Sequence, residues 1–267
     1  MSIFNFEDPV QFCSKYSFKS SNSSFVKSAC FSPDGSSLLV NTESSDNQVT
    51  ILTVDQSLIE SAKYYQDVAS SKAVSNLDSP TNGLTHFNTI QAGESVYDLK
   101  WYPFMNVQDS STNLFVTTIR DHPVQLWSAA SGQVLHSYNA HNAMDELISP
   151  LCVTFNVNGN RLYAGSNRNI TVFDISEPGK NYTLMPTSDS KKSPLGQRGI
   201  ISTLSFSPDY SGVYAAGSYA HNISIYVENE QESVLALREL PMAVTCMKWS
   251  PCGTYLWAGG RCHEDIR

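Results

Sequence analysis

The run Cys262–Asp265 (CHED) contains the side-chain types that most often bind zinc in proteins. These four residues fall in a turn before an expected strand, where such side chains normally form hydrogen bonds with the backbone. A second acidic pair, Asp145 and Glu146, lies on a loop or strand, where adjacent side chains point apart rather than forming a general acid and base. We therefore expect no metal site and no cofactor.

The usual enzymatic motifs are missing as well. The sequence has no Gly-rich phosphate loop, no HExxH and no GxSxG, so we expect a protein that is not an enzyme and has no small-molecule substrate. The six cysteines are scattered without any CxxC pair, which favours free thiols over a disulfide framework or a zinc site: Cys13, Cys30, Cys152, Cys246, Cys252 and Cys262.

Composition indicates a globular protein of one or two domains. Hydrophobic residues make up 41% of the 267 residues and charged residues only 16%, which is enough apolar content for a sizeable core. The formal net charge of −8 argues against a general nucleic-acid coat but leaves room for a local basic patch. The sequence has neither a transmembrane run nor a secretory signal pattern, so we expect no membrane partner and a nuclear or cytoplasmic address.

An internal repeat organises the chain. Its elements are an alternating stretch that ends in an aromatic residue, a turn, a run of small residues and a second alternation. Five copies follow one another, and their aromatic anchors are 70, 54, 51 and 43 residues apart: Phe31, Trp101, Phe155, Phe206 and Trp249. This period, with inserted loops, is the size of one propeller blade.

Each copy makes physical sense as three strands of a blade, which we assign as strands b, c and d. The Ser32–Gly35 sequence (SPDG) predicts a tight turn between the first two strands. Small residues such as Ala216-Gly217-Ser218 permit close approach of a neighbouring backbone. The second alternation, for example Val124–Trp127, predicts an outer strand with Trp127 as a further structural anchor. A generic antiparallel sandwich is the alternative.

The domain layout follows from these copies. Residues 25–267 form an all-β propeller of about five blades out of a ring of seven, and residues 1–24 form an N-terminal extension that could supply a ring-closing strand. Stretches near 55–89 and 176–198 lack the repeat pattern and are expected to be surface insertions. Because the fifth copy runs out inside its own blade, we expect a truncated product, a partial gene model or the N-terminal part of a longer protein.

Particular phrases in the copies are more specific than the repeat. From about Asn22 onward, several segments resemble, in order, the telomerase Cajal body protein family of WD-repeat proteins: Gly93–Met105 (GESVYDLKWYPFM), Arg120–Trp127 (RDHPVQLW), Gly132–Leu147 (GQVLHSYNAHNAMDEL), RGIISTLSFSP and YAAGSY. The resemblance implies a seven-bladed propeller that binds small non-coding RNAs of the H/ACA class, including telomerase RNA, within ribonucleoproteins and directs them to Cajal bodies. It implies a nuclear location.

The chain also departs from that family. The last two blades are missing, LRELPMAV stands where a Gly-His pair is usual, and the long acidic or proline-rich N-terminal region is absent. The short start is fungal-like, and relatives of that kind are linked to splicing particles. RNA binding therefore transfers with the family more readily than the identity of the RNA.

RNA recognition requires cations for phosphate and planar groups for unstacked bases. The cations expected to serve lie in turns and in one flexible loop: Arg120, His122, Arg168, Lys191, Lys192 and Arg198. For each there is an alternative: the Asp121-His122 turn forms an ordinary hydrogen-bond network, and the loop charges are merely solvated. Tyr219 and Trp257 could stack on bases, although aromatic residues in blade strands more often belong to the core.

Three functional hypotheses remain. The first is an RNA-binding factor for assembling or localising small non-coding ribonucleoproteins. The second is a protein-interaction scaffold, associated with a spliceosomal or other ribonucleoprotein particle, that does not touch RNA. The third, an enzyme built on a propeller, is disfavoured because no catalytic constellation is present.

Overall fold

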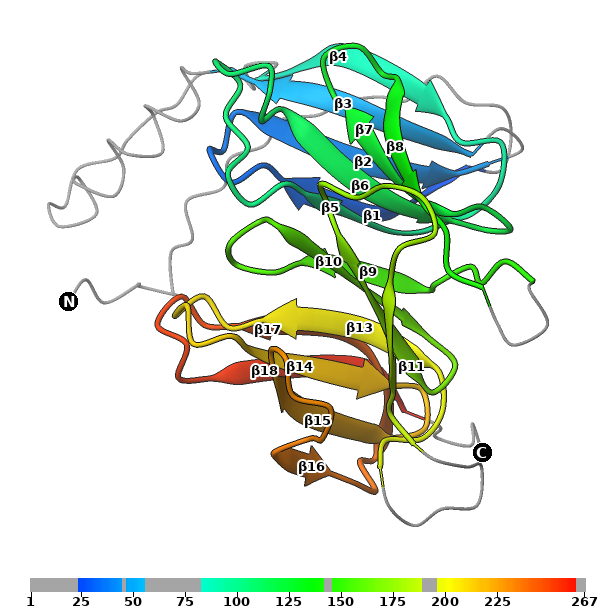
Figure 1. Cartoon of the computed structure of the whole chain (residues 1–267). Coiled ribbons are helices and arrows are strands. Elements are labelled where there is room, and N and C mark those ends of the chain that lie inside the picture. The colour runs from blue at the N-terminus through cyan, green and yellow to red at the C-terminus, as the bar shows by residue number, and fades with distance from the viewer. Residues whose placement is uncertain (1–23, 45–46, 56–82, 142–145, 189–195, 263–267) are drawn as a thin grey trace, which may run out of the picture.

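The computed structural model describes residues 24–44, 47–55, 83–141, 146–188 and 196–262 (Figure 1). Within these ranges no helix is long and apolar enough to span a membrane. The strands form five antiparallel sheets, which we call blades 1 to 5. The predicted all-β propeller architecture is confirmed.

The four-stranded blades follow the chain in simple order. Blade 1 contains β1 (Phe25–Phe31), β2 (Ser37–Glu43), β3 (Gln48–Val54) and β4 (Leu84–Gln91). Blade 2 contains β5 (Val96–Trp101), β6 (Leu114–Ile119), β7 (Val124–Ser128) and β8 (Val134–Tyr138). Blade 3 contains β9 (Cys152–Phe155), β10 (Arg161–Ser166), β11 (Asn169–Asp174) and β12 (Thr183–Pro186).

Blade 4 contains β13 (Ile201–Phe206), β14 (Val213–Ser218), β15 (Asn222–Val227) and β16 (Leu235–Leu237). In the described part of the chain, blade 5 contains two strands, β17 (Met242–Trp249) and β18 (Leu256–Cys262). The first strands of successive blades, β1, β5, β9, β13 and β17, contact one another in turn, so they are the innermost strands. Figure 1 shows the blades succeeding one another from blue to red.

The strand positions require a correction. The three strands assigned as b, c and d are the first, second and third strands from the inside, and the outermost strands β4, β8, β12 and β16 were not predicted. These outermost strands are mostly exposed and lack the repeated motif, so the pattern did not reveal them. β12 lies within the expected insertion 176–198, and β4 overlaps the end of the expected insertion 55–89 and runs two residues beyond it.

The expected tight turn between first and second strands is present in blade 1. The Gly35 N–H donates to the Ser32 carbonyl at 2.9 Å, and Gly35 has a φ of 73°, a conformation that favours glycine. The Asp34 carboxylate accepts hydrogen bonds from the Ser32 hydroxyl at 2.6 Å and from the Ser36 N–H at 3.0 Å. The Asp34 carboxylate therefore links the two ends of the turn through hydrogen bonds.

Burial differs among the residues expected as blade anchors. Trp101, Trp127 and Phe155 are buried, while Phe206 and Trp249 are partly buried. Phe31 is 61% exposed, as is most of β1 apart from the half-buried Cys30. The indole N–H of Trp101 donates to the Cys30 carbonyl of blade 1, and that of Trp249 donates to the Ser205 carbonyl of blade 4. These two anchors therefore bond to the preceding blade as well as filling space.

The small residues of the second strands stand where neighbouring blades come close. A Cβ atom added at Gly165 would lie 2.5 Å from Cys152 Sγ and 2.7 Å from Ile201 Cγ2 of blade 4. At Gly217 it would lie 2.6 Å from Val244 Cγ1 of blade 5. These glycines therefore permit close approach, but of neighbouring side chains rather than of the neighbouring backbone that the sequence led us to expect.

We predict that Gly217→Val lowers the free energy of unfolding by about 1–3 kcal/mol, because the added atoms meet Val244 in a packed junction. Urea unfolding followed by tryptophan fluorescence measures the change. Ala236→Val, at a half-buried position of β16, is the matched control and should change stability by less than about 0.5 kcal/mol. Equal effects of the two substitutions would contradict the close approach.

Candidate nucleic-acid interface

The turns between second and third strands lie on one face of the propeller, which we call the arginine face. Strands alternate in direction, so these turns share that face with the connections that lead into each next blade. Arg120 and His122 lie in the β6–β7 turn, Arg168 in the β10–β11 turn and Arg198 in the connection into blade 4. Lys191 and Lys192 lie outside the described residues.

A common backbone conformation underlies these turns. In blades 1 to 4, the turn between second and third strands contains a non-glycine residue with a positive φ: Asn47 (34°), Asp121 (56°), Arg168 (59°) and His221 (60°). In three of the four, its main chain also bonds to the connection into the next blade. Asn47 O accepts from Ala92 N, Arg168 N donates to Gly199 O, and His221 O accepts from Leu240 N. The turns thus have a structural task that the main chain performs, joined in blade 4 by the His221 ring, whose Nδ1 lies 3.0 Å from Leu240 O.

In the β6–β7 turn, much of the polar capacity is used locally. His122 Nδ1 lies 2.7 Å from the Arg120 carbonyl, and the His122 N–H donates to Ile119 O at 3.2 Å. Arg120 Nε lies 3.5 Å from Asp121 Oδ2, and the two side chains are 59% and 80% exposed. Such an exposed pair contributes little stability, so the Arg120 guanidinium remains accessible to an external anion, while His122 serves the turn.

Tertiary structure brings Arg168 next to the segment that contains Arg198. The Arg168 N–H donates to Gly199 O at 2.9 Å, and the Arg168 carbonyl accepts from Thr187 N at 2.9 Å. The Arg198 carbonyl accepts from Ser218 Oγ at 2.7 Å and Asn222 Nδ2 at 3.2 Å. These bonds fix the backbones of both arginines side by side across the junction of blades 3 and 4. The Nε atom of Arg168 is buried, and the structure shows no hydrogen bond for it.

An aromatic residue of the same face bonds through its backbone to the segment that follows Arg198. Tyr219 begins the β14–β15 turn on the same face, is 44% exposed, and its N–H donates to Ile200 O at 3.1 Å. Trp257 is 60% exposed but lies within β18, away from this turn. Guanidinium groups with a neighbouring exposed aromatic ring suit phosphate contact and base stacking. Sequence reasoning named each residue but could not place Arg168, Arg198 and Tyr219 together.

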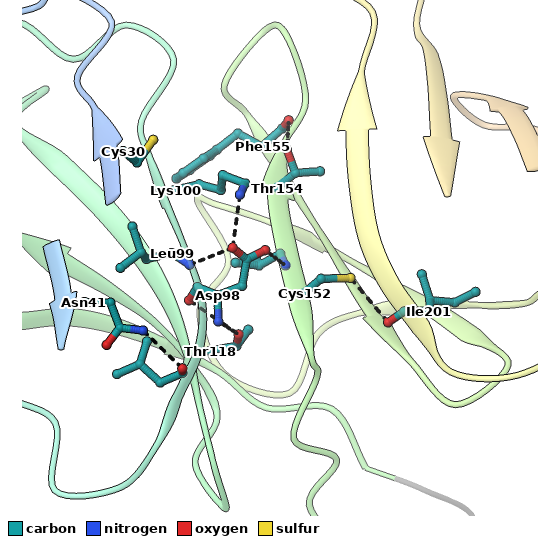
Figure 2. A network of polar contacts seen from close by, with 12 residues as sticks. Cys30, Asn41, Asp98, Leu99, Lys100, Thr118, Cys152, Thr154, Phe155 and Ile201 are labelled. Atoms are coloured by element: carbon teal, nitrogen blue, oxygen red, sulfur yellow. Dashed lines mark hydrogen bonds and ion pairs between the residues drawn. The ribbon is translucent and has the colours of Figure 1, made fainter. Parts of the chain in front are cut away.

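Sequence reasoning missed a polar network between the innermost strands (Figure 2). Asp98 Oδ1 accepts from Leu99 N at 2.9 Å and from Lys100 Nζ at 3.0 Å. Its other oxygen accepts from Val153 N of blade 3 at 3.1 Å. The Asp98 carboxylate raises the pKa of Lys100, which stays charged. The only sequence feature that pointed to this network was Asp98 itself, an acidic residue between Tyr97 and Lys100 in an alternating strand.

The thiols differ in character. Burial raises the pKa of Cys30 and of Cys152, so both remain protonated near neutral pH. Cys252 stands in the turn position that Asp34 and Asp209 hold in blades 1 and 4. The Ser250 hydroxyl, 3.3 Å from its sulfur, and Thr254 lower the pKa of this exposed thiol to about 7. Among the described residues there is no group of metal-ligand type, and the His263–Asp265 segment lies outside them.

Comparison with known proteins agrees with this architecture. The WD domain, G-beta repeat family matches residues 132–174, which run from β8 of blade 2 to the end of β11 of blade 3. Telomerase Cajal body protein 1 of Mus musculus is 30% identical over 95% of this chain and 43% of its own length. The Homo sapiens protein is 28% identical over 93% of this chain and 42% of its own length.

The chain is a WD-repeat protein related to telomerase Cajal body protein 1. The resemblance inferred from the repeat phrases is thereby confirmed. The guanine nucleotide-binding protein negative regulator 1 of Schizosaccharomyces pombe is similar too, at 30% identity over 91% of this chain and 58% of that protein. The chain spans less than half the length of the Cajal body relatives.

The WD-repeat match also explains the strand correction. The matched unit consists of the outermost strand of blade 2 and the first three strands of blade 3. One sequence repeat thus contributes to two blades. The repeat read from the sequence contained the three inner strands and omitted the strand that joins neighbours.

We predict that Arg168→Asn leaves the free energy of unfolding unchanged or raises it by up to about 1 kcal/mol. Asparagine tolerates a positive φ better than arginine, and the backbone bonds of this turn do not need the guanidinium. Thermal unfolding tests this expectation. A loss above about 1 kcal/mol would show that the Arg168 side chain is structural.

We also predict that Cys252 is alkylated by iodoacetamide with a rate that rises through a midpoint near pH 7, because the thiolate is the reacting form. Mass spectrometry of peptides after short exposure at several pH values measures the rate. Cys152 should stay unmodified in the folded protein, since it is buried and protonated. A midpoint near the ordinary thiol pKa would contradict the hydrogen-bonded turn.

Proposed function

We propose that this chain is a non-enzymatic, RNA-binding WD-repeat factor that acts in the assembly or localisation of small non-coding ribonucleoproteins. The observation that carries the proposal is the arginine face, where Arg120, Arg168 and Arg198 share one side of the propeller with the exposed ring of Tyr219. An acidic protein that gathers guanidinium groups at turns presents a local site for phosphate.

The relatives direct the proposal toward a class of RNA and a location. The names of several similar proteins refer to telomerase and the Cajal body. We therefore propose RNAs of the H/ACA type, telomerase RNA among them, as ligands, ribonucleoprotein proteins as partners, and the nucleus as the site of action. Lys191 and Lys192, close in sequence to Arg198, are proposed as additional phosphate contacts.

A protein-interaction scaffold without RNA contact is the second candidate. The formal charge of −8 favours it, because most of the surface repels nucleic acid. The Schizosaccharomyces pombe relative, whose name is that of a regulator of a guanine nucleotide-binding protein, is similar over nearly the same range of this chain. Binding of RNA distinguishes the two candidates.

Ultraviolet crosslinking of the tagged protein in its own cells, followed by sequencing of the attached RNA, is the first experiment. H/ACA-type or telomerase RNA is the expected product. Spliceosomal RNA would keep the binding class and change the pathway. RNA at background level would overturn the proposal in favour of the scaffold.

We predict that the double substitution Arg120→Glu with Arg168→Glu weakens binding of an H/ACA-type RNA roughly tenfold or more at moderate salt. It should also flatten the slope of log affinity against log salt by about 1.4, which corresponds to two lost phosphate contacts on single-stranded RNA. Filter binding between 50 and 200 mM salt would give both quantities.

The matched control is Lys180→Glu, the same kind of charge change in the β11–β12 connection on the opposite face. It should leave RNA affinity and salt slope nearly unchanged. Comparable losses in the control, or a large fall in melting temperature of the double variant, would mean that the arginine face is not the RNA site.

A further inference from the structure

A cavity of about 350 Å³ opens on the face opposite the arginine turns, between blades 3 and 4. Its walls come from β10, β11, the β11–β12 connection, β12 and the turn between β15 and β16. Connections between third and fourth strands lie at the far end of the strands from the arginine face. The cavity is therefore a separate site from the proposed RNA interface.

Aromatic rings form the inner part of the cavity. Phe173 and Tyr163 are buried in its floor, and Tyr182 is half-buried at its side, with its ring centroid 6.0 Å from that of Phe173. The Tyr182 hydroxyl donates to His141 O at 3.1 Å, which fixes the ring. Tyr163 is held by a hydrogen bond to Glu228 Oε1 at 3.1 Å. Because Tyr163 and Phe173 are fully buried, the Tyr182 ring, backed by Phe173, is the aromatic surface that a planar group could contact.

Carboxylates dominate the rim. Asp174, Glu177 and Glu230 line the cavity, against the single guanidinium of Arg161. Hydrogen bonds from the side chain and backbone of Ser176 lower the pKa of Asp174, so it is ionised at neutral pH. Arg161 donates to Asn229 Oδ1 at 2.6 Å, so its guanidinium group is already engaged by a residue of the cavity lining. The lining carries three negative charges and one positive charge, which disfavours an anionic ligand.

We propose that this cavity binds an arginine side chain of a partner protein. A guanidinium group is planar and always charged, pairs with carboxylates through two parallel hydrogen bonds and stacks on aromatic rings. The half-buried ring of Tyr182 and the acidic rim match both properties. A volume of about 350 Å³ is at the small end of ligand pockets, which suits one long side chain rather than a cofactor.

The two faces then have complementary roles. RNA phosphates are attracted to the arginine face and repelled by the acidic rim, whereas a basic protein segment prefers the rim. A basic ribonucleoprotein component could occupy the cavity while RNA occupies the other face. The cavity proposal does not depend on RNA binding, because the acidic and aromatic residues of the cavity are different from the residues of the arginine face.

Calorimetry and amide chemical-shift mapping of the full chain test the proposal. The probes are the blocked tripeptide Gly-Arg-Gly, with Gly-Lys-Gly and Gly-Glu-Gly for comparison. The arginine peptide should bind most tightly, the lysine peptide more weakly and the glutamate peptide not at all. Shifts should centre on Glu177, Tyr182 and Glu230.

Glu230→Gln should weaken the arginine peptide roughly fivefold, as expected for losing one partly exposed charge pair. Glu232→Gln is the matched control, because Glu232 is exposed in the same turn but does not line the cavity. Tyr182→Leu, which removes the ring, should also weaken binding, and Glu230→Gln should leave RNA affinity and melting temperature unchanged.

Equal effects of Glu230→Gln and Glu232→Gln would overturn the proposal, as would shifts spread evenly over acidic surface residues. Equal binding of the arginine and glutamate peptides would do the same. If the unmodified protein does not bind RNA but still binds the arginine peptide, the proposed function is refuted and the cavity proposal stands.

Discussion

The structure depends on the contact between successive blades, because a single twisted sheet of four strands cannot bury its own apolar faces. At each of the four described junctions one side chain of a blade bonds to the backbone of the next: Asn41 to Val96 O, Asp98 to Val153 N, Cys152 to Ile201 O and Ser202 to Val244 O. Apolar clusters fill the space outside these bonds. Polar bonds near the inner strands thus set the register in which the apolar faces pack.

The chain's connectivity reinforces this contact. Since one WD repeat runs from the outermost strand of one blade through three strands of the next, a covalent connection from rim to centre joins neighbouring blades, which also pack against each other. Positive-φ residues at the turns, including Arg168 and His221, bond to the incoming connection of the following blade. The cost of strained backbone at these turns is offset by the hydrogen bonds that fix the chain between one blade and the next.

This connectivity also places the candidate RNA-binding cations and the acidic cavity on opposite faces. Turns between second and third strands carry Arg120 and Arg168, and connections between third and fourth strands carry Glu177 and Glu230. The same acidic chain can therefore present cations to one ligand and carboxylates to another. A platform of this kind suits a protein that holds RNA and basic protein segments together, which is the role we propose within ribonucleoproteins.

The sequence by itself determined the fold class, the repeat, the anchor positions and the family relationship, because alternation, turn residues and small residues are local patterns. It also named Arg120, Arg168 and Tyr219. Only the tertiary structure decided that the repeat begins one strand earlier, that Phe31 is exposed, and that Arg168 lies beside Arg198. The Asp98 network and the acidic cavity likewise join residues of different blades. Such contacts depend on how sheets pack against each other, and local periodicity carries no information about that packing.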